Sequence, residues 1–400
     1  MRVVGIIAEY NPLHNGHIYH LEQAKQQSGA SFCIVAMSGN FVQRGEPACT
    51  DKQTRAEWAI RAGADLVIEL PSVYAVSSAE RFALGGIKTL ASTGVVTDLA
   101  FGCEETDFSC LEKLCNILDE EPTMYTRALR EHLKLGKSYA RARYDALKDY
   151  GVSHEMLGAV AQPNNILGIE YLKALRTFAP QIQPLPIARI GSDYNKTELE
   201  GEYSSATAIR KALSEGRREV LSAMPSFVGG PMLFDKQFLI TQEAIGDMVL
   251  YAMRKLSLDQ LREIPDVAEG LENVLYRAAR SANTIETFYD AVKSKRYTLA
   301  RCKRIGISAL LGIDNDHVHR TIVSKDGGYL KVLALNKNAR QLLSEISRAA
   351  SAPFIMRYAD MAAASDIAQK NLEIDSLSTD ILAYAMRRDV RRDFTAPVIL

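Results

Sequence analysis

The chain has 400 residues with a formal net charge of zero, and 47% of its residues are hydrophobic and 24% charged. This length exceeds what one hydrophobic core usually holds, so it favours two domains, and the composition is that of a globular protein. Because the charges balance, the chain as a whole would not attract nucleic acid, and any basic surface must be local. The composition therefore excludes a uniformly basic nucleic-acid-binding protein.

The cysteines and the N-terminus indicate the cellular compartment. Six cysteines without a CxxC pair are typical of reduced thiols and not of a disulfide framework. Cys103, Cys110 and Cys115 lack a fourth ligand at finger-like spacing, so we predict no metal site. The first apolar run begins within two residues of Met1, which leaves no room for a signal peptide, and no run approaches the ~18 residues of a membrane helix. We expect a cytoplasmic protein without a membrane partner.

The first two hundred residues alternate short apolar runs with helical patterns. The first four runs are rich in branched residues and nearly continuous in hydrophobicity, as parallel strands buried on both faces should be. Strands are predicted at 3–9, 31–37, 65–70, 98–102 and 182–190, and helices at about 17–28, 51–62 and 78–92. Capping boxes are predicted at two helix starts, Thr50 with Gln53 and Ser77 with Glu80. This order predicts an α/β fold with a Rossmann-like, doubly wound parallel sheet and right-handed crossovers.

Helical patterns dominate the rest of the chain. Residues 106–178 carry no strand signal and are predicted to be a helical insertion before the last strand. The stretch GGPMLFDKQ (229–237) has the glycine pair and proline of a linker. Beyond it, residues 238–312 are mostly helical, YLKVLAL (329–335) is one clear strand, and a helix follows at about 338–350. We therefore expect a first domain of residues 1–225 and a mostly α-helical C-terminal domain of residues 238–400.

The stretch EYNPLHNGH (9–17) directly follows the first predicted strand and opens the first helix. Ligands of open α/β folds bind at this carboxyl edge of the sheet. Gly16 permits close backbone approach, and the helix N-terminus offers unpaired N–H groups and the positive end of a dipole. His14 and His17 can then face one polyphosphate, which would favour their protonated form, and stabilise charge on an α-phosphate during in-line attack. The alternatives are a polar helix cap or two zinc ligands, although zinc would want i, i+4 spacing and a third ligand.

This HNGH stretch resembles the HxGH signature of the nucleotidylyltransferase superfamily, whose two histidines contact nucleotide phosphates during adenylyl transfer. A second superfamily element, a hydroxyl- and arginine-bearing turn before a late helix, is similar to SSATAIR (204–210). Ser204, Ser205 and Thr207 would supply hydroxyl and N-cap donors. Arg210 would supply a fork for a β- or γ-phosphate. The alternative for this stretch is an ordinary helix cap.

Longer blocks sharpen the resemblance to one family. They are GIIAEYNPLHNGH, MSGNFVQRGEP, DKQTRAEWAIRAGADLVIELP, SAERFALGG, FGCE, QPNNILGIEYLKAL and ARIGSDYN. These blocks resemble the bacterial tRNA-methionine cytidine acetate ligase family through the first 215 residues, and more loosely to the C-terminus. The resemblance implies a fold of the nucleotidylyltransferase type and three substrates: ATP with its Mg²⁺, acetate, and elongator tRNA-Met. Acetate would become acetyl-adenylate with loss of pyrophosphate, and the N4 amine of the wobble cytidine would then attack it, giving N4-acetylcytidine and AMP.

The resemblance also implies which residues form the site. The catalytic residues would be His14, His17 and Arg210. The ATP pocket would comprise Ile7, Ala8, Glu9, Tyr10, Asn11, Pro12, Leu13, His14, Asn15, Gly16, His17, Ile18, Tyr19, His20, Gly102, Asn164, Asn165, Arg189, Ser204, Ser205 and Thr207. A glycine allows close approach of the adenine or ribose, and an asparagine can discriminate adenine by paired hydrogen bonds. Many superfamily members carry aspartate where this chain has Asn11, so the ligands of the metal stay open.

Two further regions are predicted to contact substrates. Arg44 and Lys52 follow the second strand, and we expect them near acetate or the cytidine. A cytidine in a single-stranded anticodon loop leaves the stack at little cost. The alternative is a solvated loop and helix. The run KSKRYTLARCKR (293–304) carries a basic surface for tRNA, or else a solvated helix face. Its residues are Lys293, Lys295, Arg296, Tyr297, Arg301, Lys303 and Arg304, with Lys331, Lys337 and Arg340 as a possible extension.

Two other functions compete with the ligase. A small-molecule nucleotidylyltransferase of cofactor biosynthesis would need only the first domain, whereas this chain has about 170 further residues. A non-catalytic RNA-binding protein would have no need of intact HNGH and SSATAIR stretches. Acetate-dependent exchange of pyrophosphate into ATP would separate the ligase from both.

Overall fold

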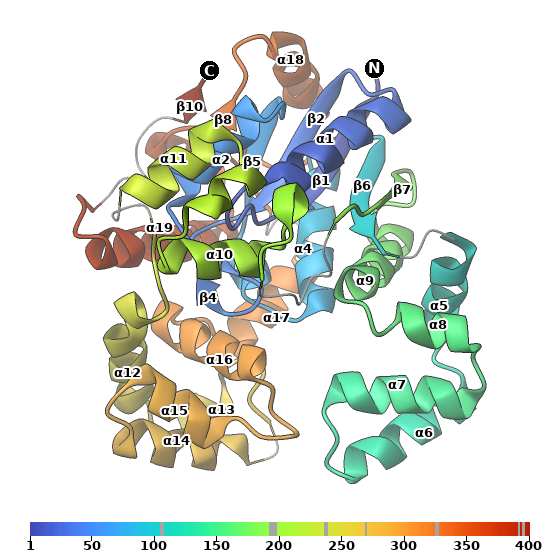
Figure 1. The fold of residues 1–400 in the computed structure, drawn as a ribbon, viewed down its shortest axis with the longest axis vertical. Helices are drawn as coiled ribbons and strands as arrows, with labels where there is room; N and C mark the ends of the chain where they lie inside the picture. The colour runs from blue at the N-terminus through green and yellow to red at the C-terminus, as the bar shows by residue number, and fades with distance from the viewer. Residues whose placement is uncertain are drawn as a thin grey trace.

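A central sheet organises the chain in a computed structural model that describes residues 1–104, 108–191, 198–235, 239–268, 270–324, 328–390, 393 and 397–400. Its strands are β1 (Val3–Ala8), β2 (Phe32–Ser38), β5 (Leu66–Leu70), β6 (Asp98–Cys103), β7 (Gln183–Ala188), β8 (Leu330–Leu335), β9 (Phe354–Ile355) and β10 (Val398–Ile399). They lie in the order β10-β8-β5-β2-β1-β6-β7, with β9 paired to β8 (Figure 1). The five strands β5, β2, β1, β6 and β7 are parallel. This confirms the predicted doubly wound α/β sheet.

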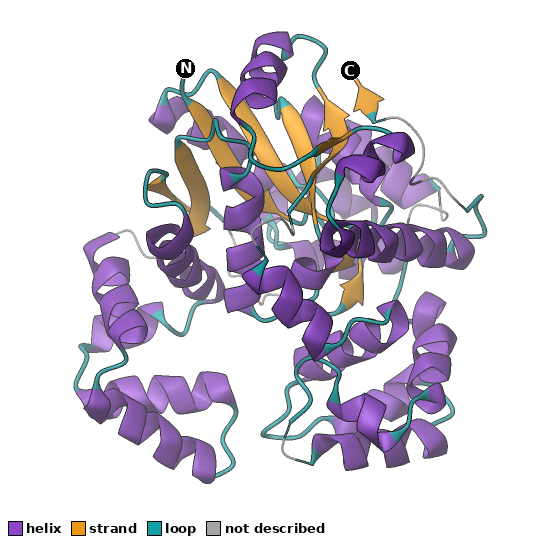
Figure 2. Ribbon diagram, turned by 180° about the vertical axis from the view of Figure 1, so that it is seen from behind, coloured by secondary structure: helices purple, strands orange, loops and turns teal. Residues whose placement is uncertain are grey.

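Both faces of the sheet are covered by helices, as Figure 2 shows from behind. Val3 and Leu66 belong to a core shared with α4 and α9, whereas their neighbours Val4 and Val67 belong to a core shared with α1 and α2. Because alternate residues of a strand point to opposite faces, burial on both sides requires the nearly continuous apolar runs seen in the sequence. These helices are α1 (Asn15–Ser28), α2 (Lys52–Arg61), α4 (Ala79–Ala91) and α9 (Pro163–Phe178), with the short α3 (Ser72–Ala75) before α4.

The helix starts differ from the predicted capping boxes by one residue. Asp51 and not Thr50 caps α2, because its carboxylate accepts the backbone N–H of Thr54 at 2.9 Å. Ser78 and not Ser77 caps α4, and the Ser77 hydroxyl instead donates to the carbonyl of Tyr74 at 2.5 Å. Adjacent hydroxyl or carboxylate residues can both cap, and backbone geometry decides between them.

The predicted helical insertion forms a series of helices that projects from the sheet (Figure 1). Its elements are α5 (Phe108–Glu120), α6 (Thr123–Lys134), α7 (Tyr139–Tyr150), α8 (His154–Ala159) and finally α9, which packs on α4. After β7 come the 3-10 helices η1 (Gly201–Tyr203) and η2 (Arg218–Ala223), and the helices α10 (Ala206–Ser214) and α11 (Ser226–Phe234). The predicted linker at 229–237 is therefore wrong over 229–234. Val228 and Met232 pack into the core on the α1 face, and this packing outweighs the hydrogen bond that Pro231 cannot make.

The region predicted as one C-terminal domain is divided in the structure. Its first part is a group of helices outside the sheet, which we call the C-terminal helical body: η4 (Glu243–Ile245), α12 (Gly246–Lys255), α13 (Leu258–Arg262), α14 (Leu271–Ser281), α15 (Ile285–Val292) and α16 (Leu299–Leu311). Helix α17 (Asn315–Val323) leads back to the sheet, where β8 lies antiparallel to β5. The remaining elements are α18 (Arg340–Ala349), η5 (Tyr358–Ala363) and α19 (Asp366–Ala385). Strands β8, β9 and β10 therefore complete the sheet, and every residue of β8 is buried.

None of the helices built from the described residues is both long and apolar enough to cross a bilayer.

Candidate active site

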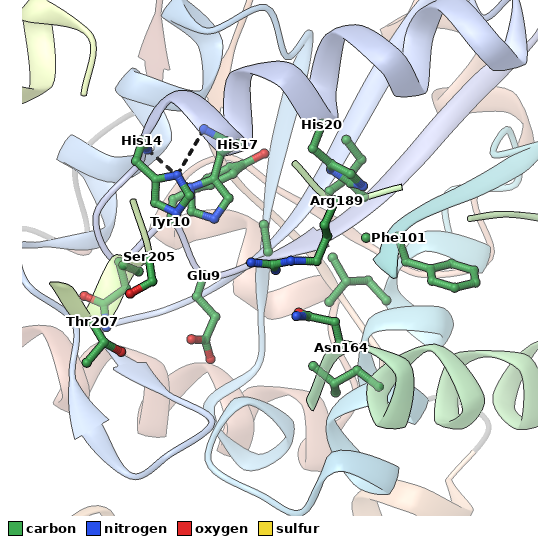
Figure 3. A pocket seen from close by; sticks show the side chains of 18 of the residues that line it. Glu9, Tyr10, His14, His17, His20, Phe101, Asn164, Arg189, Ser205 and Thr207 are labelled. Atoms are coloured by element: carbon green, nitrogen blue, oxygen red, sulfur yellow. Dashed lines mark hydrogen bonds between the residues drawn. The ribbon is translucent and has the colours of Figure 1, made fainter. Parts of the chain in front are cut away.

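A cavity of about 240 Å³ opens at the carboxyl ends of β1, β6 and β7 (Figure 3). Its walls come from the β1–α1 loop, the first turns of α1, the N-termini of α9 and α10, and a hairpin of β3 (Phe41–Val42) and β4 (Glu46–Pro47). The predicted site residues that line it are Ile7, Ala8, Glu9, Tyr10, Asn11, His14, Gly16, His17, Tyr19, His20, Arg44, Gly102, Asn164, Arg189, Ser204, Ser205, Thr207 and Arg210. The sheet edge thus brings together the ends of β1, β6 and β7, which lie about 90 residues apart in the sequence.

The two predicted histidines form the N-terminal cap of α1 and one wall of the cavity. His14 Nδ1 accepts the Gly16 N–H at 3.1 Å, and His17 Nδ1 accepts the His14 N–H at 3.3 Å. Their rings stack with centroids 3.8 Å apart, and the Tyr10 ring meets His17 edge-on at 5.1 Å. A Cβ on Gly16 would lie 3.0 Å from His14 Cε1, so the glycine makes room for the capping ring. The two histidines therefore both cap α1, as one alternative held, and line the cavity, while their contact with a phosphate stays a prediction.

Burial favours the neutral form of both histidines, and the protonated form that a bound phosphate would favour stays a prediction. Burial, reinforced by the positive charges of Arg189 and Arg210, lowers the pKa of His14 to about 3. Burial likewise holds the pKa of His17 well below its usual value, with a further contribution from His14. Because each Nδ1 accepts a backbone N–H, the ring proton must be on Nε2. Two N–H donors can therefore point at an anion without a change of protonation.

Arg189 and Asn164 line the opposite wall, and Glu104 positions both. The Glu104 Oε1 accepts the side-chain amide of Asn164 and lies 3.8 Å from Arg189 Nε, while its Oε2 accepts the Asn165 N–H at 3.2 Å. The Asn165 side chain does not line the cavity. Its Oδ1 accepts the Glu104 N–H at 2.9 Å and its Nδ2 donates to the Ala159 carbonyl at 3.2 Å. Of the two asparagines offered by the sequence, Asn164 is therefore the one that faces the cavity.

The N-terminus of α10 forms the third wall. Ser205 caps the helix by accepting the Ala208 N–H at 3.1 Å. The Ser204 hydroxyl donates to the Gly201 carbonyl at 2.9 Å, so it holds the preceding turn. Arg210 lines the cavity but donates to the backbone carbonyl of Asn11 at 2.7 Å. One of its nitrogens thus fixes the β1–α1 loop, which the sequence had not indicated.

Glu9 lies between the α10 wall and Asn164 (Figure 3). Its Oε1 accepts the N–H of Gln43 at 2.8 Å, which fixes the carboxylate between β1 and the β3–β4 hairpin. Burial raises the pKa of Glu9, and the Gln43 N–H and the charges of Arg210, Arg55 and Arg44 oppose the rise. The side chain is therefore an oriented carboxylate with increased basicity.

Lys52 does not line the cavity, so its predicted place beside acetate or the cytidine is wrong. Its ammonium is fully buried and lies 2.6 Å from Glu69 Oε1 and 2.7 Å from Asp393 Oδ1. The second carboxylate comes from the far end of the chain, so no local pattern could indicate it. Lys331, offered as an extension of a basic surface, is buried in the same cluster and pairs with Glu69 and Asp393.

Some predicted residues of the first loop and helix face away from the cavity. Leu13 is buried in the core, and the Asn15 side chain donates to the carbonyls of Glu202 and Ser222. Pro12 and Ile18 do not line the cavity either. Asn11 Oδ1 accepts the Cys49 N–H at 2.7 Å, so this side chain holds a loop. Within the described ranges, no group of three His, Cys, Asp or Glu side chains is arranged to bind a metal.

An apolar wall of the cavity was missed by sequence reasoning. It comprises Val42, Phe82, Phe101, Leu167, Tyr171 and Ile187, and Glu46 and Tyr203 were missed as well. These apolar residues follow the periodicity of ordinary core positions, so the sequence contains no signal that separates them from the core. Only the arrangement of β3, α4, β6, α9 and β7 makes them one surface.

In the basic run at 293–304, the side chains of Arg301, Lys303 and Arg304 bond to other parts of the protein. Arg304 pairs with Asp266 at 2.7 Å, and Arg301 Nε donates to the Asp266 carbonyl at 2.8 Å. Lys303 Nζ lies 2.5 Å from Glu46 Oε1, so α16 contacts a residue that lines the cavity. Lys295 is exposed, as is Lys293, which pairs with a neighbouring carboxylate; Arg296 and Tyr297 are half-buried. None of this run lines the cavity.

Comparisons with known proteins agree with this geometry. A family model described as HIGH Nucleotidyl Transferase matches residues 1–395. The tRNA(Met) cytidine acetate ligase of Acetivibrio thermocellus is 38% identical over 414 residues, and that of Caldanaerobacter subterraneus subsp. tengcongensis is 41% identical over 408 residues. Both alignments cover 100% of this chain and 100% of the relative.

Two solved structures of Thermotoga maritima TmcAL share the whole fold at 33% identity. The apo form has a TM-score of 0.93 and the form bound with alpha-thio ATP has one of 0.91, and each comparison covers 100% of both chains. The family resemblance predicted from the sequence is confirmed. The chain therefore belongs to the HIGH nucleotidyl transferases and, within them, to the tRNA(Met) cytidine acetate ligases, a family of ligases.

Proposed function

We propose that this chain uses ATP to activate acetate as acetyl-adenylate and transfers the acetyl group to the N4 amine of the wobble cytidine in elongator tRNA-Met. The observation that carries the proposal is the pair of stacked, neutral imidazoles at the N-terminus of α1, facing Arg189 and α10 across one cavity. The relatives named tRNA(Met) cytidine acetate ligase, and the neighbour bound with alpha-thio ATP, support it.

The cavity suits ATP at both ends. The Nε2–H groups of His14 and His17, Arg189 and the positive ends of the α1 and α10 dipoles favour the triphosphate. Phe101 and Tyr171 offer aromatic surface to the base, and the Asn164 amide offers it polar contacts. Mg²⁺ would arrive with ATP and neutralise phosphate charge. We assign it no protein ligands, because Glu9 and Glu46 are the only carboxylates among the described lining residues.

In the first step an acetate oxygen bonds to the α-phosphorus, and the bond from that phosphorus to the bridging oxygen breaks. Pyrophosphate leaves with the electron pair. His14 and His17 would stabilise the charge that builds on the α-phosphate by donating their Nε2–H groups, a contribution of about 3 kcal/mol per donor. Their neutral state keeps both donors available throughout the neutral pH range.

In the second step the N4 amine of cytidine bonds to the acetyl carbon, and AMP leaves with the electron pair of the broken carbon–oxygen bond. The nitrogen must lose one proton. Glu9 would accept it, because this carboxylate faces the cavity, is oriented by Gln43 and has a raised pKa.

Two measurements test this function. Pyrophosphate exchange into ATP should require acetate and proceed without tRNA. Labelled acetate should then appear in N4-acetylcytidine of elongator tRNA-Met, read by mass spectrometry of nucleosides. Exchange that does not depend on acetate would favour a small-molecule nucleotidylyltransferase. RNA binding without any ATP turnover would favour a non-catalytic RNA-binding protein. Formate and propionate, tested in place of acetate, would define the acyl selectivity.

A further inference from the structure

The helical insertion carries a surface that neither the active site nor the basic run at 293–304 accounts for. The insertion and the C-terminal helical body project on the same side of the sheet, the side toward which β6 runs (Figure 1). The carboxyl ends of the parallel strands, where the cavity opens, face this side. Any large substrate that delivers one nucleotide to the cavity must therefore pass close to the insertion.

The α6–α7 hairpin is the basic part of the insertion. Residues 123–150 contain seven Lys and Arg and three Asp and Glu, a net charge of 7 − 3 = +4 in a chain of zero net charge. Arg127 and Arg141 are paired with carboxylates of their own helices. Arg130, Lys134 and Lys148 are exposed and form no ion pair within the described part of the chain. Their positive charge is therefore available to a partner.

The exposed cations lie beside exposed apolar and aromatic side chains. Arg130 and Lys134 are four residues apart and so share one face of α6. Leu135 is 72% exposed and Tyr139 is 57% exposed, where α6 ends and α7 begins. The Arg143 guanidinium lies 6.0 Å from the centroid of the Tyr139 ring, and the exposed part of that ring can take an unstacked base, while the cations suit phosphates. The carboxylates of the hairpin already have partners, since Glu131 pairs with Arg127, Asp145 with Arg141 and Asp149 with His132.

We propose that the end of α6 and the start of α7, through Arg130, Lys134 and Tyr139, bind the backbone and an exposed base of the RNA whose cytidine enters the cavity. This inference rests on the proposed function, because that function requires an RNA substrate. RNA fits better than a protein partner because the hairpin carries an excess of four positive charges, and its exposed apolar side chains, Met124 and Leu135, lie at opposite ends of α6 and form no continuous face. The insertion and the C-terminal helical body then approach the RNA from two sides.

The test is charge reversal of the full-length protein at Arg130→Glu/Lys134→Glu. The matched control, which we call the α18 control, is Arg348→Glu/Lys370→Glu, which makes the same charge change at exposed positions of α18 and α19 that were assigned to no site. The probe is unmodified elongator tRNA-Met, titrated at several salt concentrations. We expect affinity to fall at least tenfold in the test variant. The slope of log affinity against log salt concentration should become shallower by about 1.5, because the counterions that two phosphate contacts release are no longer released. The control should match wild type.

Two further variants separate the loss of RNA contacts from damage to the helix. Arg130→Gln/Lys134→Gln avoids a glutamate at the C-terminus of α6 and should show the same effect more weakly. Tyr139→Ala should lower affinity about five- to tenfold without changing the salt slope, because stacking releases no counterions. Unchanged affinity and slope in the reversal variant, or an equal loss in the α18 control, would overturn the inference. Acetate-dependent pyrophosphate exchange should persist in every variant, and its absence from wild type would refute the proposed function instead.

Discussion

At the scale of single residues, the site combines helix capping with the proposed phosphate contacts in the same side chains. His14 and His17 satisfy backbone N–H groups of α1 through Nδ1, and this leaves Nε2–H as the group that can face a phosphate. Backbone hydrogen bonds therefore set the tautomer, and burial beside Arg189 keeps both rings neutral. Gly16 completes the arrangement because any larger residue would meet the His14 ring.

Replacement of His17 by alanine should lower acetate-dependent pyrophosphate exchange at least a hundredfold, because loss of one transition-state donor costs about 3 kcal/mol. The affinity for tRNA should stay near wild type. His319→Ala, at an exposed position of α17, is the matched control and should exchange normally. Equal exchange in both variants would remove the phosphate role from the histidine pair.

Replacement of Glu9 by glutamine should separate the two steps. The amide oxygen can still accept the Gln43 N–H, so exchange should persist, whereas acetyl transfer should fall about a hundredfold or more. Only the ionised carboxylate can accept a proton, so wild-type transfer should rise with pH through the raised pKa of Glu9, and the variant should lack that rise. A parallel loss of exchange would instead place Glu9 in ATP binding.

The three half-buried histidines at the start of α1, His14, His17 and His20, should make stability depend on pH. Burial lowers the pKa of His14 to about 3 and of His20 to about 4, while an unfolded histidine titrates near its ordinary value. Between pH ~6.5 and ~4 the unfolded chain therefore binds more protons, so the free energy of unfolding falls as pH falls through this window. Urea unfolding at pH 7.5 and 5.0 measures the drop, which should be smaller in His20→Asn. An equal drop in both proteins would contradict the assignment.

At the scale of elements, α16 supports the active site more than it forms a basic surface. A Cβ on Gly45 would lie 2.3 Å from the Arg304 backbone nitrogen, so the β3–β4 hairpin packs directly on the α16 backbone. Lys303 then pairs with Glu46, on the same hairpin. Because Gln43 and Arg44 lie at the hairpin turn, the C-terminal helical body helps to position two residues of the cavity.

Arg304→Glu should therefore destabilise the fold, because it places a glutamate against the half-buried Asp266. We expect a loss of about 1–3 kcal/mol, between the values for exposed and buried pairs. Lys295→Glu makes the same charge change at an exposed site and should unfold like wild type. Chemical denaturation compares the two. If Arg304→Glu leaves stability intact but flattens the salt dependence of tRNA binding, the basic run is an RNA surface after all.

At the scale of the whole molecule, the end of the chain is tied to its beginning by a buried ionic cluster. Lys52 of α2 and Lys331 of β8 share the carboxylates of Glu69 and Asp393. The cluster links the parallel strand β5 to the antiparallel strand β8 and to the C-terminal segment. Strands β8 and β10, near the end of the chain, therefore belong to the same sheet as β1, which ends at the cavity.

Asp393→Asn should cost about 3–5 kcal/mol, because it leaves two buried ammonium groups with one carboxylate. Asp389→Asn changes an exposed carboxylate four residues earlier and should have little effect. Denaturant unfolding of both variants gives the comparison. A stability equal to that of the control would show that the Lys52 and Lys331 charges are compensated without the C-terminal segment.

The sequence by itself determined the features whose information is local. Continuous apolar runs predicted the parallel strands, HNGH after the first strand predicted the site, and the longer blocks predicted the family, because each depends on neighbouring residues. Tertiary structure alone decided which polar groups meet. Lys52 pairs with a carboxylate 341 residues away, Arg304 pairs with Asp266, and the apolar wall of the cavity comes from five separate elements. A charged side chain pairs with the opposite charge that the fold brings close to it, and the order of residues along the chain does not show which residue that is.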